Sequence, residues 1–228
     1  MRYLIIIAVF TTACATSGTV MKSGGSMDVV ENPIVQTGNP VLRARAKDVP
    51  VEQIATPEFQ QLIVRMTDAM RKAPGVGLAA PQLGVSLRVL VLEDPEALQV
   101  SLTQQERAER ERTPVPLRVI INPTLTPVGE ERVTFFEGCL SVAGFAGLVE
   151  RWREVEVSGL DEKGQPQTWC VRGWPARILQ HEVDHLDGTL YVDRMITRSF
   201  GTLPQVKALY GGKPIAEVKQ LLGVKEPR

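Results

Sequence analysis

A stripe of apolar residues at helical spacing is the clearest pattern in the first half of the chain. Its members are Phe59, Leu62, Ile63, Met66 and Met70. The sequence Thr-Pro-Glu at 56–58 comes just before them and supplies an N-cap, a proline for the first turn and an early acidic residue. The pattern predicts an amphipathic helix whose apolar face belongs to the core.

Short runs rich in β-branched and apolar residues predict strands. The predicted strands are 88–92, 118–121, 132–136, 147–159, 166–172 and a last short one at 190–192. The arms 147–159 and 166–172 are expected to pair as a hairpin across the turn at 161–164. Residues 94–117 predict a surface excursion with a short helix near 103–106, and residues 215–222 predict a terminal helix.

A second helix is predicted after Trp174, with Pro175 in its first turn and Gly188 at its C-terminal end. It is apolar on more than one side, which is typical of a buried helix. Together these elements predict an α+β fold, in which antiparallel sheets pack around a central buried helix.

Composition narrows the classes of partner. The chain has 228 residues, enough for one sizeable core, and its 26 Lys and Arg balance 26 Asp and Glu. A formal net charge of zero argues against a long-range field for nucleic acid, so no direct nucleic-acid partner is expected. A local basic patch, such as one that meets a ribosome, is still compatible with this balance.

The N-terminal segment 1–33 is expected to lie outside the fold, which leaves 34–228 as the folded domain. A positive start, the apolar run 4–10 and small residues before Cys14 are typical of a secretory or lipoprotein signal. The alternative is a start codon placed too far upstream, since Met21 and Met27 also precede the domain. The apolar run is too short to cross a bilayer, so no stable membrane span is expected.

The run Gln-His-Glu-Val-Asp-His at 180–185 carries the strongest chemical signal. His181 and His185 are the only two histidines of the chain, and residues four apart lie above one another on a helix. Two such imidazoles can bind one metal ion, with Glu182 beside them as a proton acceptor. A solvated helix that merely carries two histidines is the alternative. Catalytic sites of this kind usually have three protein ligands, so a third must come from elsewhere.

The three cysteines are the candidates for that third ligand. An odd number in a chain of this length gives no disulfide framework. Cys14 lies in the N-terminal segment, and Cys170 is expected to be a buried, inert thiol on a strand. Cys139 follows Glu137 and Gly138 at the end of an apolar run, where glycine permits a bend. From these residues alone, Cys139 could be either a metal ligand or a core thiol.

Three blocks in order carry a family resemblance. They are Gly-Val-Gly-Leu-Ala-Ala-Pro-Gln at 75–82, Glu-Gly-Cys-Leu-Ser at 137–141 and the histidine run at 180–185. Together they resemble the three signature motifs of peptide deformylase, and the resemblance extends from about residue 35 to about residue 195. The continuation at 141–145 and the insert after the first block are most similar to the subclass that includes organelle-type deformylases.

The resemblance implies a set of roles for the residues in these blocks. Cys139, His181 and His185 would bind one divalent metal ion per chain, Fe²⁺ by resemblance, with Zn²⁺, Ni²⁺ or Co²⁺ also suited to such ligands. Glu182 would be the catalytic base. Gln82 and the Leu140 N–H would stabilise the oxyanion. Substrate contacts are expected from Gly75, Val76, Gly77, Gly138, Arg177 and Ile178.

The implied activity is hydrolysis of the formyl group from N-formylmethionyl nascent peptides in the cytoplasm. Two rivals stay open at this point. A metallopeptidase would need a third ligand downstream of the histidines, where no further histidine occurs. An exported binding protein that keeps only the fold would not need Glu182 and Gln82 together with all three ligands.

Overall fold

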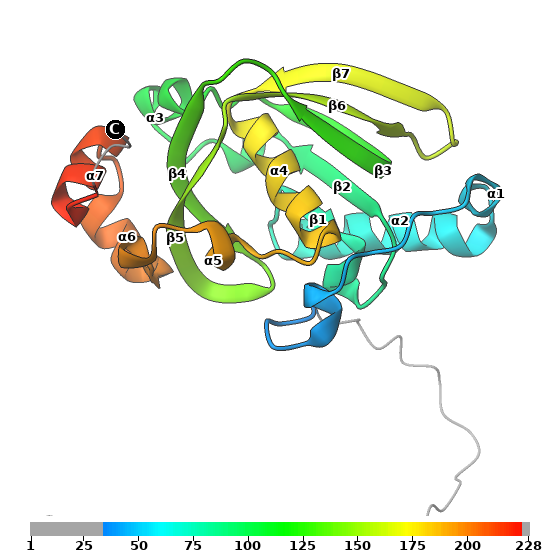
Figure 1. Cartoon of the computed structure of the whole chain (residues 1–228). Helices are drawn as coiled ribbons and strands as arrows, with labels where there is room; N and C mark the ends of the chain where they lie inside the picture. The colour runs from blue at the N-terminus through cyan, green and yellow to red at the C-terminus, as the bar shows by residue number, and fades with distance from the viewer. Residues whose placement is uncertain (1–33, 225–228) are drawn as a thin grey trace, which may run out of the picture. The chain divides into compact units, whose positions relative to one another are not determined.

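The computed structural model describes residues 34–224, and the features expected for 1–33 lie outside them. The described residues form two antiparallel sheets with helices around and between them (Figure 1), which agrees with the α+β prediction. In this part of the chain, no helix is long and apolar enough to cross a membrane.

The larger sheet has the strand order β1-β2-β3-β6-β7 and the smaller one has the order β4-β5-β8. The strands of the larger sheet are β1 (Gly77–Ala79), β2 (Val89–Asp94), β3 (Val115–Pro127), β6 (Glu154–Leu160) and β7 (Pro166–Arg172). Those of the smaller sheet are β4 (Arg132–Cys139), β5 (Val142–Trp152) and β8 (Gly201–Thr202). This order leaves β1 and β4 as edge strands of their respective sheets.

The α-helices are α1 (Val51–Ile54), α2 (Pro57–Lys72), α3 (Gln104–Glu109), α4 (Trp174–Leu186), α5 (Tyr191–Arg194), α6 (Leu203–Tyr210) and α7 (Ile215–Leu222). Short 3₁₀ helices lie at Pro40–Arg43, Ala80–Leu83, Glu96–Leu98 and Thr197–Ser199. Helix α2 begins as predicted, because the Thr56 side chain accepts a hydrogen bond from the Phe59 N–H at 3.3 Å. Its predicted apolar stripe is buried in the core.

Helix α4 lies between the two sheets in Figure 1 and contacts strands of both. It packs against an apolar cluster built largely from the larger sheet, and Ala176, Leu179 and Leu186 are fully buried there. The helix ends where predicted, with Gly188 in the left-handed region at φ +74°. The buried helix therefore holds its polar side chains in a place where water does not reach them freely.

The predicted strand 147–159 is wrong as a single element. Residues up to Trp152 belong to β5 and pair with β4, whereas β6 begins at Glu154 and forms the predicted hairpin with β7. The chain crosses from the smaller sheet to the larger one at Arg153, whose N–H donates a hydrogen bond to the Glu131 carbonyl at 2.9 Å. Alternation along the chain cannot reveal that one apolar run serves two sheets.

Two further predictions about local structure are wrong. Residues 190–192 start helix α5 instead of a strand, because the Asp193 carboxylate accepts a hydrogen bond from the Leu190 N–H at 2.8 Å. Cys170 is exposed instead of buried. It lies on β7, an edge strand of the larger sheet, where no strand or helix of the described part of the chain covers its side chain.

The insert 94–117 contains the predicted short helix, α3, with a reciprocal cap between Thr103 and Glu106. Some of its charges are buried. Arg112 donates two hydrogen bonds of 2.8 Å to Asp94, whose side chain is fully buried. The guanidinium groups of Arg110 and Arg112 lie 5.5 and 5.3 Å from the centre of the Trp174 ring. The insert therefore packs against the first turn of α4.

Candidate active site

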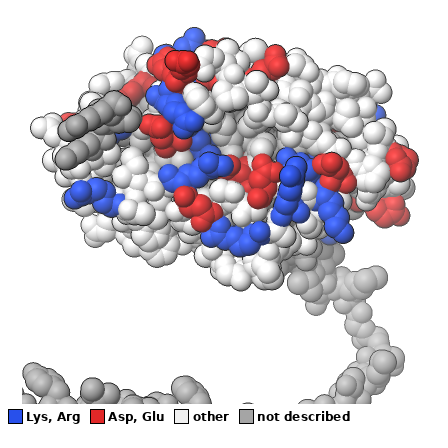
Figure 2. Space-filling view, viewed as in Figure 1, with Lys and Arg blue, Asp and Glu red and all other residues white. Residues whose placement is uncertain are grey.

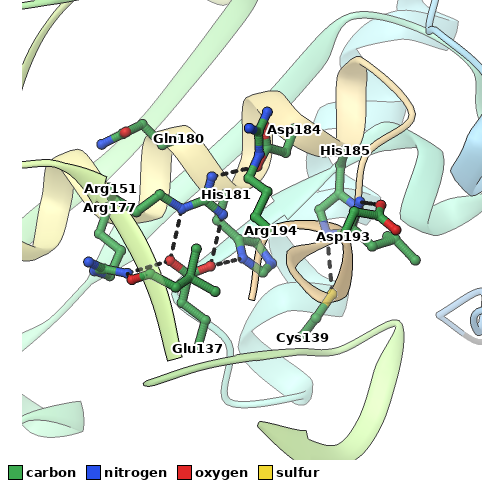
Figure 3. A network of polar contacts seen from close by, with 12 residues as sticks. Glu137, Cys139, Arg151, Arg177, Gln180, His181, Asp184, His185, Asp193 and Arg194 are labelled. Carbon is green, nitrogen blue, oxygen red and sulfur yellow. Dashed lines mark hydrogen bonds and ion pairs between the residues drawn. The ribbon is translucent and has the colours of Figure 1, made fainter. Parts of the chain in front are cut away.

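The end of β4 and the middle of α4 bring three metal-ligating side chains together. The ligand-capable atoms of Cys139, His181 and His185 all lie within 4.8 Å of one another. Cys139 Sγ is 3.2 Å from His185 Nε2, and Figure 3 shows the thiol directed at that ring. The spacing of four residues along α4 places the two imidazoles on one side of the helix, edge to face, with ring centres 5.1 Å apart.

Glu137 orients His181. Its Oε2 lies 2.9 Å from His181 Nδ1, which leaves the other ring nitrogen, Nε2, available as a ligand (Figure 3). Arg151 donates two hydrogen bonds of 2.9 Å to the same carboxylate, and Arg177 donates one of 2.6 Å. Burial would raise the pKa of Glu137, but Arg151 and His181 outweigh burial and hold that pKa well below its usual range.

The charge network continues from Glu137 to the surface. Arg151 also donates to Asp184 at 2.5 Å, and Asp184 accepts two further bonds from Arg194, whose side chain is half exposed. The sequence analysis does not identify Arg151 and Asp184 as part of the site. The sequence signal for them is weak: Asp184 lies inside the histidine run, but Arg151 is one of many arginines.

Glu182 is buried, with 4% of its surface exposed, and its Oε2 has no hydrogen-bond partner among the described residues. Burial raises the pKa of this carboxyl to about 7. The backbone of β1 passes very close to it, because a Cβ at Gly77 would lie 2.5 Å from Glu182 Oε1. A glycine is needed there, and a carboxyl in this state is suited to exchange protons near neutral pH.

Gln82 is also buried, in the 3₁₀ helix Ala80–Leu83. Its Oε1 accepts a hydrogen bond from the Ala79 N–H at 2.8 Å. That bond fixes the amide so that Nε2 faces Ser141 Oγ at 3.3 Å and Cys139 Sγ at 3.7 Å. The backbone N–H of Ser141 also donates to Cys139 Sγ at 3.3 Å.

A cavity of about 480 Å³ opens beside these groups. All six residues expected to contact substrate line it, namely Gly75, Val76, Gly77, Gly138, Arg177 and Ile178. Leu140, Gln82, His181 and Glu182 are on its wall as well. Sequence reasoning missed several further lining residues, which lie far from the motifs or on loops beside them: Pro74, Arg112, Phe136, Ala143, Gly144, Trp174 and Leu203.

Arg177 does more than line the cavity. Its guanidinium is in fact buried, and it donates to Glu137, to the Val149 carbonyl at 2.9 Å and to the Val133 carbonyl at 2.6 Å. These bonds tie α4 to both long strands of the smaller sheet. Arg177 therefore holds the site together in addition to lining it.

A sulfur and two imidazoles lie around one point, beside a buried carboxyl on the cavity wall whose Oε2 has no hydrogen-bond partner among the described residues. This arrangement defines the class of metal-dependent hydrolases. A family model described as polypeptide deformylase matches residues 31–200. The chain belongs to the peptide deformylase family, whose members remove the N-formyl group from newly made polypeptides.

Several known peptide deformylases are similar in sequence to most of this chain. Peptide deformylase 1A, chloroplastic, of Solanum lycopersicum is 46% identical over 194 residues, which are 85% of this chain and 70% of that protein. The mitochondrial peptide deformylase of Homo sapiens is 48% identical over 167 residues, or 73% of this chain and 69% of that one. The Met-Ala-Ser-bound class I type b peptide deformylase of Acinetobacter baumannii superposes with a TM-score of 0.63 at 33% identity, covering 72% and 97% of the two chains.

Proposed function

We propose that Cys139, His181 and His185 bind one divalent metal ion and that Glu182 is the acid–base group of the deformylation reaction. The observation that carries this proposal is the convergence of the three ligand atoms within 4.8 Å, next to a buried carboxyl oxygen that no described residue bonds. The donor set also fits a metal ion. Glu137 orients one imidazole, and burial holds the pKa of His185 well below its ordinary value, so that its ring is neutral.

One thiolate and two imidazoles suit several first-row divalent metals, and affinity order alone does not select among them. We propose Fe²⁺ as the physiological ion, on the basis of the family resemblance. When bound, such an ion would act as a Lewis acid and lower the pKa of a bound water toward about 7.

The chain's own residues then account for the proton transfers and the charge. Glu182 accepts a proton from the attacking water and later delivers it to the departing amine. Negative charge develops on the formyl oxygen, and the Gln82 Nε2 group and the Leu140 backbone N–H are the proposed donors to it. Because Gln82 is already fixed by the Ala79 N–H, its amide needs little reorganisation as charge develops.

The two edge strands suggest how a peptide binds. The end of β4 and the residues at β1 line the cavity from opposite sheets, and within residues 34–224 neither strand has a partner on its outer edge. An extended peptide between them can pair its backbone with both. The methionine side chain would enter the apolar part of the cavity, beside Val76, Trp174 and Ile178.

The assignment is tested by single-turnover and steady-state assays of formyl-Met-Ala-Ser with full-length protein, before and after removal of metal. Loss of turnover on chelation, with recovery on adding back Fe²⁺, Ni²⁺ or Co²⁺, is the expected result. Hydrolysis that continues in metal-free protein would refute a metal site at Cys139.

The site geometry argues against the two alternative functions, a metallopeptidase and a binding protein. A metallopeptidase would need a carboxylate or imidazole ligand downstream of the histidines, and the first acid there, Asp187, accepts a hydrogen bond of 2.6 Å from Arg88. A binding protein that keeps only the fold has no use for a buried carboxyl with a pKa near 7.

Domain limits, compartment and partners complete the proposal. We assign 34–228 to the catalytic domain and place its work in the cytoplasm, where formylated chains of a bacterial type are made. The two relatives described above are named as chloroplastic and mitochondrial forms.

Lysines and arginines on the face in Figure 2 are intermixed with acidic residues, so a ribosome contact stays a prediction. Recovery of the native protein lipidated at Cys14 in an envelope fraction would contradict the cytoplasmic assignment.

A further inference from the structure

Leu140 and Ser141 form the turn between β4 and β5. Strand β4 ends at Cys139 and β5 begins at Val142, and these two residues are paired, so the turn consists of only two residues. Two-residue hairpin turns match the twist of their strands when the first central residue has a positive φ, and other turn types splay the strands. Neither Leu140 nor Ser141 has a positive φ. The turn therefore needs support from another part of the chain.

This turn carries two groups of the proposed site. The Leu140 N–H is the proposed oxyanion donor, and Leu140 also lines the cavity. The next backbone N–H, that of Ser141, donates to Cys139 Sγ at 3.3 Å. A shift of the turn would therefore displace the oxyanion donor and the sulfur ligand together.

The side chain of Gln36 bonds to this turn from 104 positions earlier in the chain. Its Nε2 donates to the Leu140 carbonyl at 2.9 Å and to the Ile34 carbonyl at 3.0 Å, and its Oε1 accepts from the Ala143 N–H at 3.4 Å. The amide thus uses both hydrogens and its oxygen, although Gln36 is exposed. Fixing an exposed glutamine costs side-chain entropy, so it is the three hydrogen bonds together that hold the amide in place.

Gln36 is connected to the sulfur ligand through a single peptide group. The Leu140 carbonyl that accepts from Gln36 and the Ser141 N–H that donates to Cys139 Sγ belong to the same planar peptide. Hydrogen bonds linked in this way polarise one another. The next peptide is held as well, because the Thr37 N–H donates to the Ser141 carbonyl at 2.7 Å. The segment that contains Gln36 therefore fixes two successive peptides of the second motif.

We propose that Gln36 is a positioning residue for deformylation. Its amide fixes the turn at Leu140 and Ser141, so that Cys139 Sγ and the Leu140 N–H keep the positions that metal binding and oxyanion stabilisation require. The proposal rests on the proposed function. Gln36 belongs to none of the three motifs and does not line the cavity, so it acts only through the turn.

The test measures hydrolysis of formyl-Met-Ala-Ser by full-length, metal-loaded protein. Gln36→Leu removes all three hydrogen bonds, whereas Gln36→Glu keeps the acceptor for the Ala143 N–H and loses both donors. Each variant should lower kcat by about three- to tenfold, the change that corresponds to one lost neutral hydrogen bond. KM should stay near that of wild type, because Gln36 does not line the cavity.

Asn39→Ala is the matched control. Asn39 lies in the same exposed segment, and its side chain caps the 3₁₀ helix Pro40–Arg43 by accepting a hydrogen bond from the Val41 N–H at 3.1 Å. This variant also loses a local hydrogen bond but should keep the kcat of wild type. A second measurement needs neither metal nor substrate: in metal-free protein, amide hydrogen exchange at Ser141 should be faster in both Gln36 variants and unchanged in Asn39→Ala.

The outcomes separate this proposal from the catalytic assignment. If wild type hydrolyses the peptide but Gln36→Leu leaves kcat unchanged, or if Asn39→Ala lowers kcat as much, Gln36 has no specific role and the proposal falls, while the catalytic assignment stands. The same holds if Gln36→Glu keeps the kcat of wild type, because the donor to Leu140 is then not needed, or if exchange at Ser141 is equal in all four proteins. Failure of wild type to turn over the peptide would remove the catalytic assignment, and the Gln36 proposal with it.

Discussion

Glu182 is the residue whose surroundings make least sense for stability alone. A buried carboxyl without a hydrogen-bond partner among the described residues costs free energy, and its pKa rises to about 7 in response. By contrast, Glu137 and Asp184 are buried with complete sets of arginine partners. Glu137 and Asp184, whose carboxylates are paired with arginines, are therefore expected to support the site. Glu182, whose Oε2 has no hydrogen-bond partner among the described residues, is the residue that we expect to react.

Glu182→Gln is expected to reduce kcat by about 10²–10⁴-fold, the usual contribution of a general acid–base group. Metal content should stay near that of wild type, because the side chain is not a proposed ligand. Steady-state kinetics and metal analysis of the same preparation check both points. Glu150→Gln, on β5 with its side chain 39% exposed, is the control. Near-normal turnover in metal-loaded Glu182→Gln would contradict the assignment.

Cys139→Ala removes one of three proposed ligands and should therefore lose both metal and activity. Metal per chain after dialysis is the measurement. Cys170→Ala is a matched control, since that thiol is exposed on β7 and distant in the topology from the ligand cluster. Full metal retention in Cys139→Ala would mean that another residue completes the site.

Gly77→Ala should impair catalysis without removing a functional group. The added Cβ would fall 2.5 Å from Glu182 Oε1, so either the carboxyl or β1 has to move. We expect at least a tenfold lower kcat with metal retained, because small displacements of a catalytic group are costly. Unchanged kcat would show that Glu182 tolerates more freedom than its packing suggests.

At the scale of elements, Arg151 connects three of them. It lies on β5, bonds Glu137 on β4 and bonds Asp184 on α4, and only 4% of its side chain is exposed. Arg177 adds bonds from α4 to the carbonyls of Val133 and Val149. The smaller sheet and the histidine helix are therefore joined by buried charge as well as by apolar contact, and the positions of Cys139 and His181 depend on that joint.

Arg151→Met should lower the free energy of unfolding by about 3–5 kcal/mol, since it leaves two carboxylates buried without their shared partner. Urea unfolding of the metal-free protein measures this without a contribution from bound ion. Lys213→Met is the control. Its pair with Glu217 is exposed, and such helix pairs contribute about 0.5 kcal/mol or less. Equal effects of the two changes would contradict the importance given to the network.

At the scale of the whole molecule, the first described residues pass directly beside the site. The Val35 N–H donates to the Gln82 carbonyl at 2.8 Å, and the Thr37 N–H donates to the Ser141 carbonyl at 2.7 Å. Ile34 packs against the cluster that buries α2. The first described residues thus bridge the first and second motifs, which lie on different sheets.

A chain that begins at Met27 should fold, bind metal and deformylate formyl-Met-Ala-Ser as well as the full chain does. A chain that begins at Asn39 should lose about 1–3 kcal/mol of stability, because it lacks both bridging hydrogen bonds and the Ile34 contact. Urea unfolding and kcat/KM of the two truncated proteins check this. Equal stability of both would show that the bridge contributes little.

The sequence by itself predicted two histidines as metal ligands and most of the elements. The apolar stripe of α2, the all-round apolar pattern of α4 and the turn at 161–164 are local, so periodicity and capping predict them without any partner. The histidine run likewise needs only a helix to place its two imidazoles on one side. Metal chemistry could therefore be inferred before any fold was known.

Only the tertiary structure decided which strands lie at an edge and which distant residues meet. Exposure of Cys170, the division of 147–159 between two sheets and the helix at Tyr191–Arg194 all depend on neighbours far along the chain. So do the contact between Glu137 and His181, 44 positions apart, and the stacking of Phe145 on Phe200. Sequence periodicity reports which face of an element is apolar, whereas packing between elements decides what covers that face.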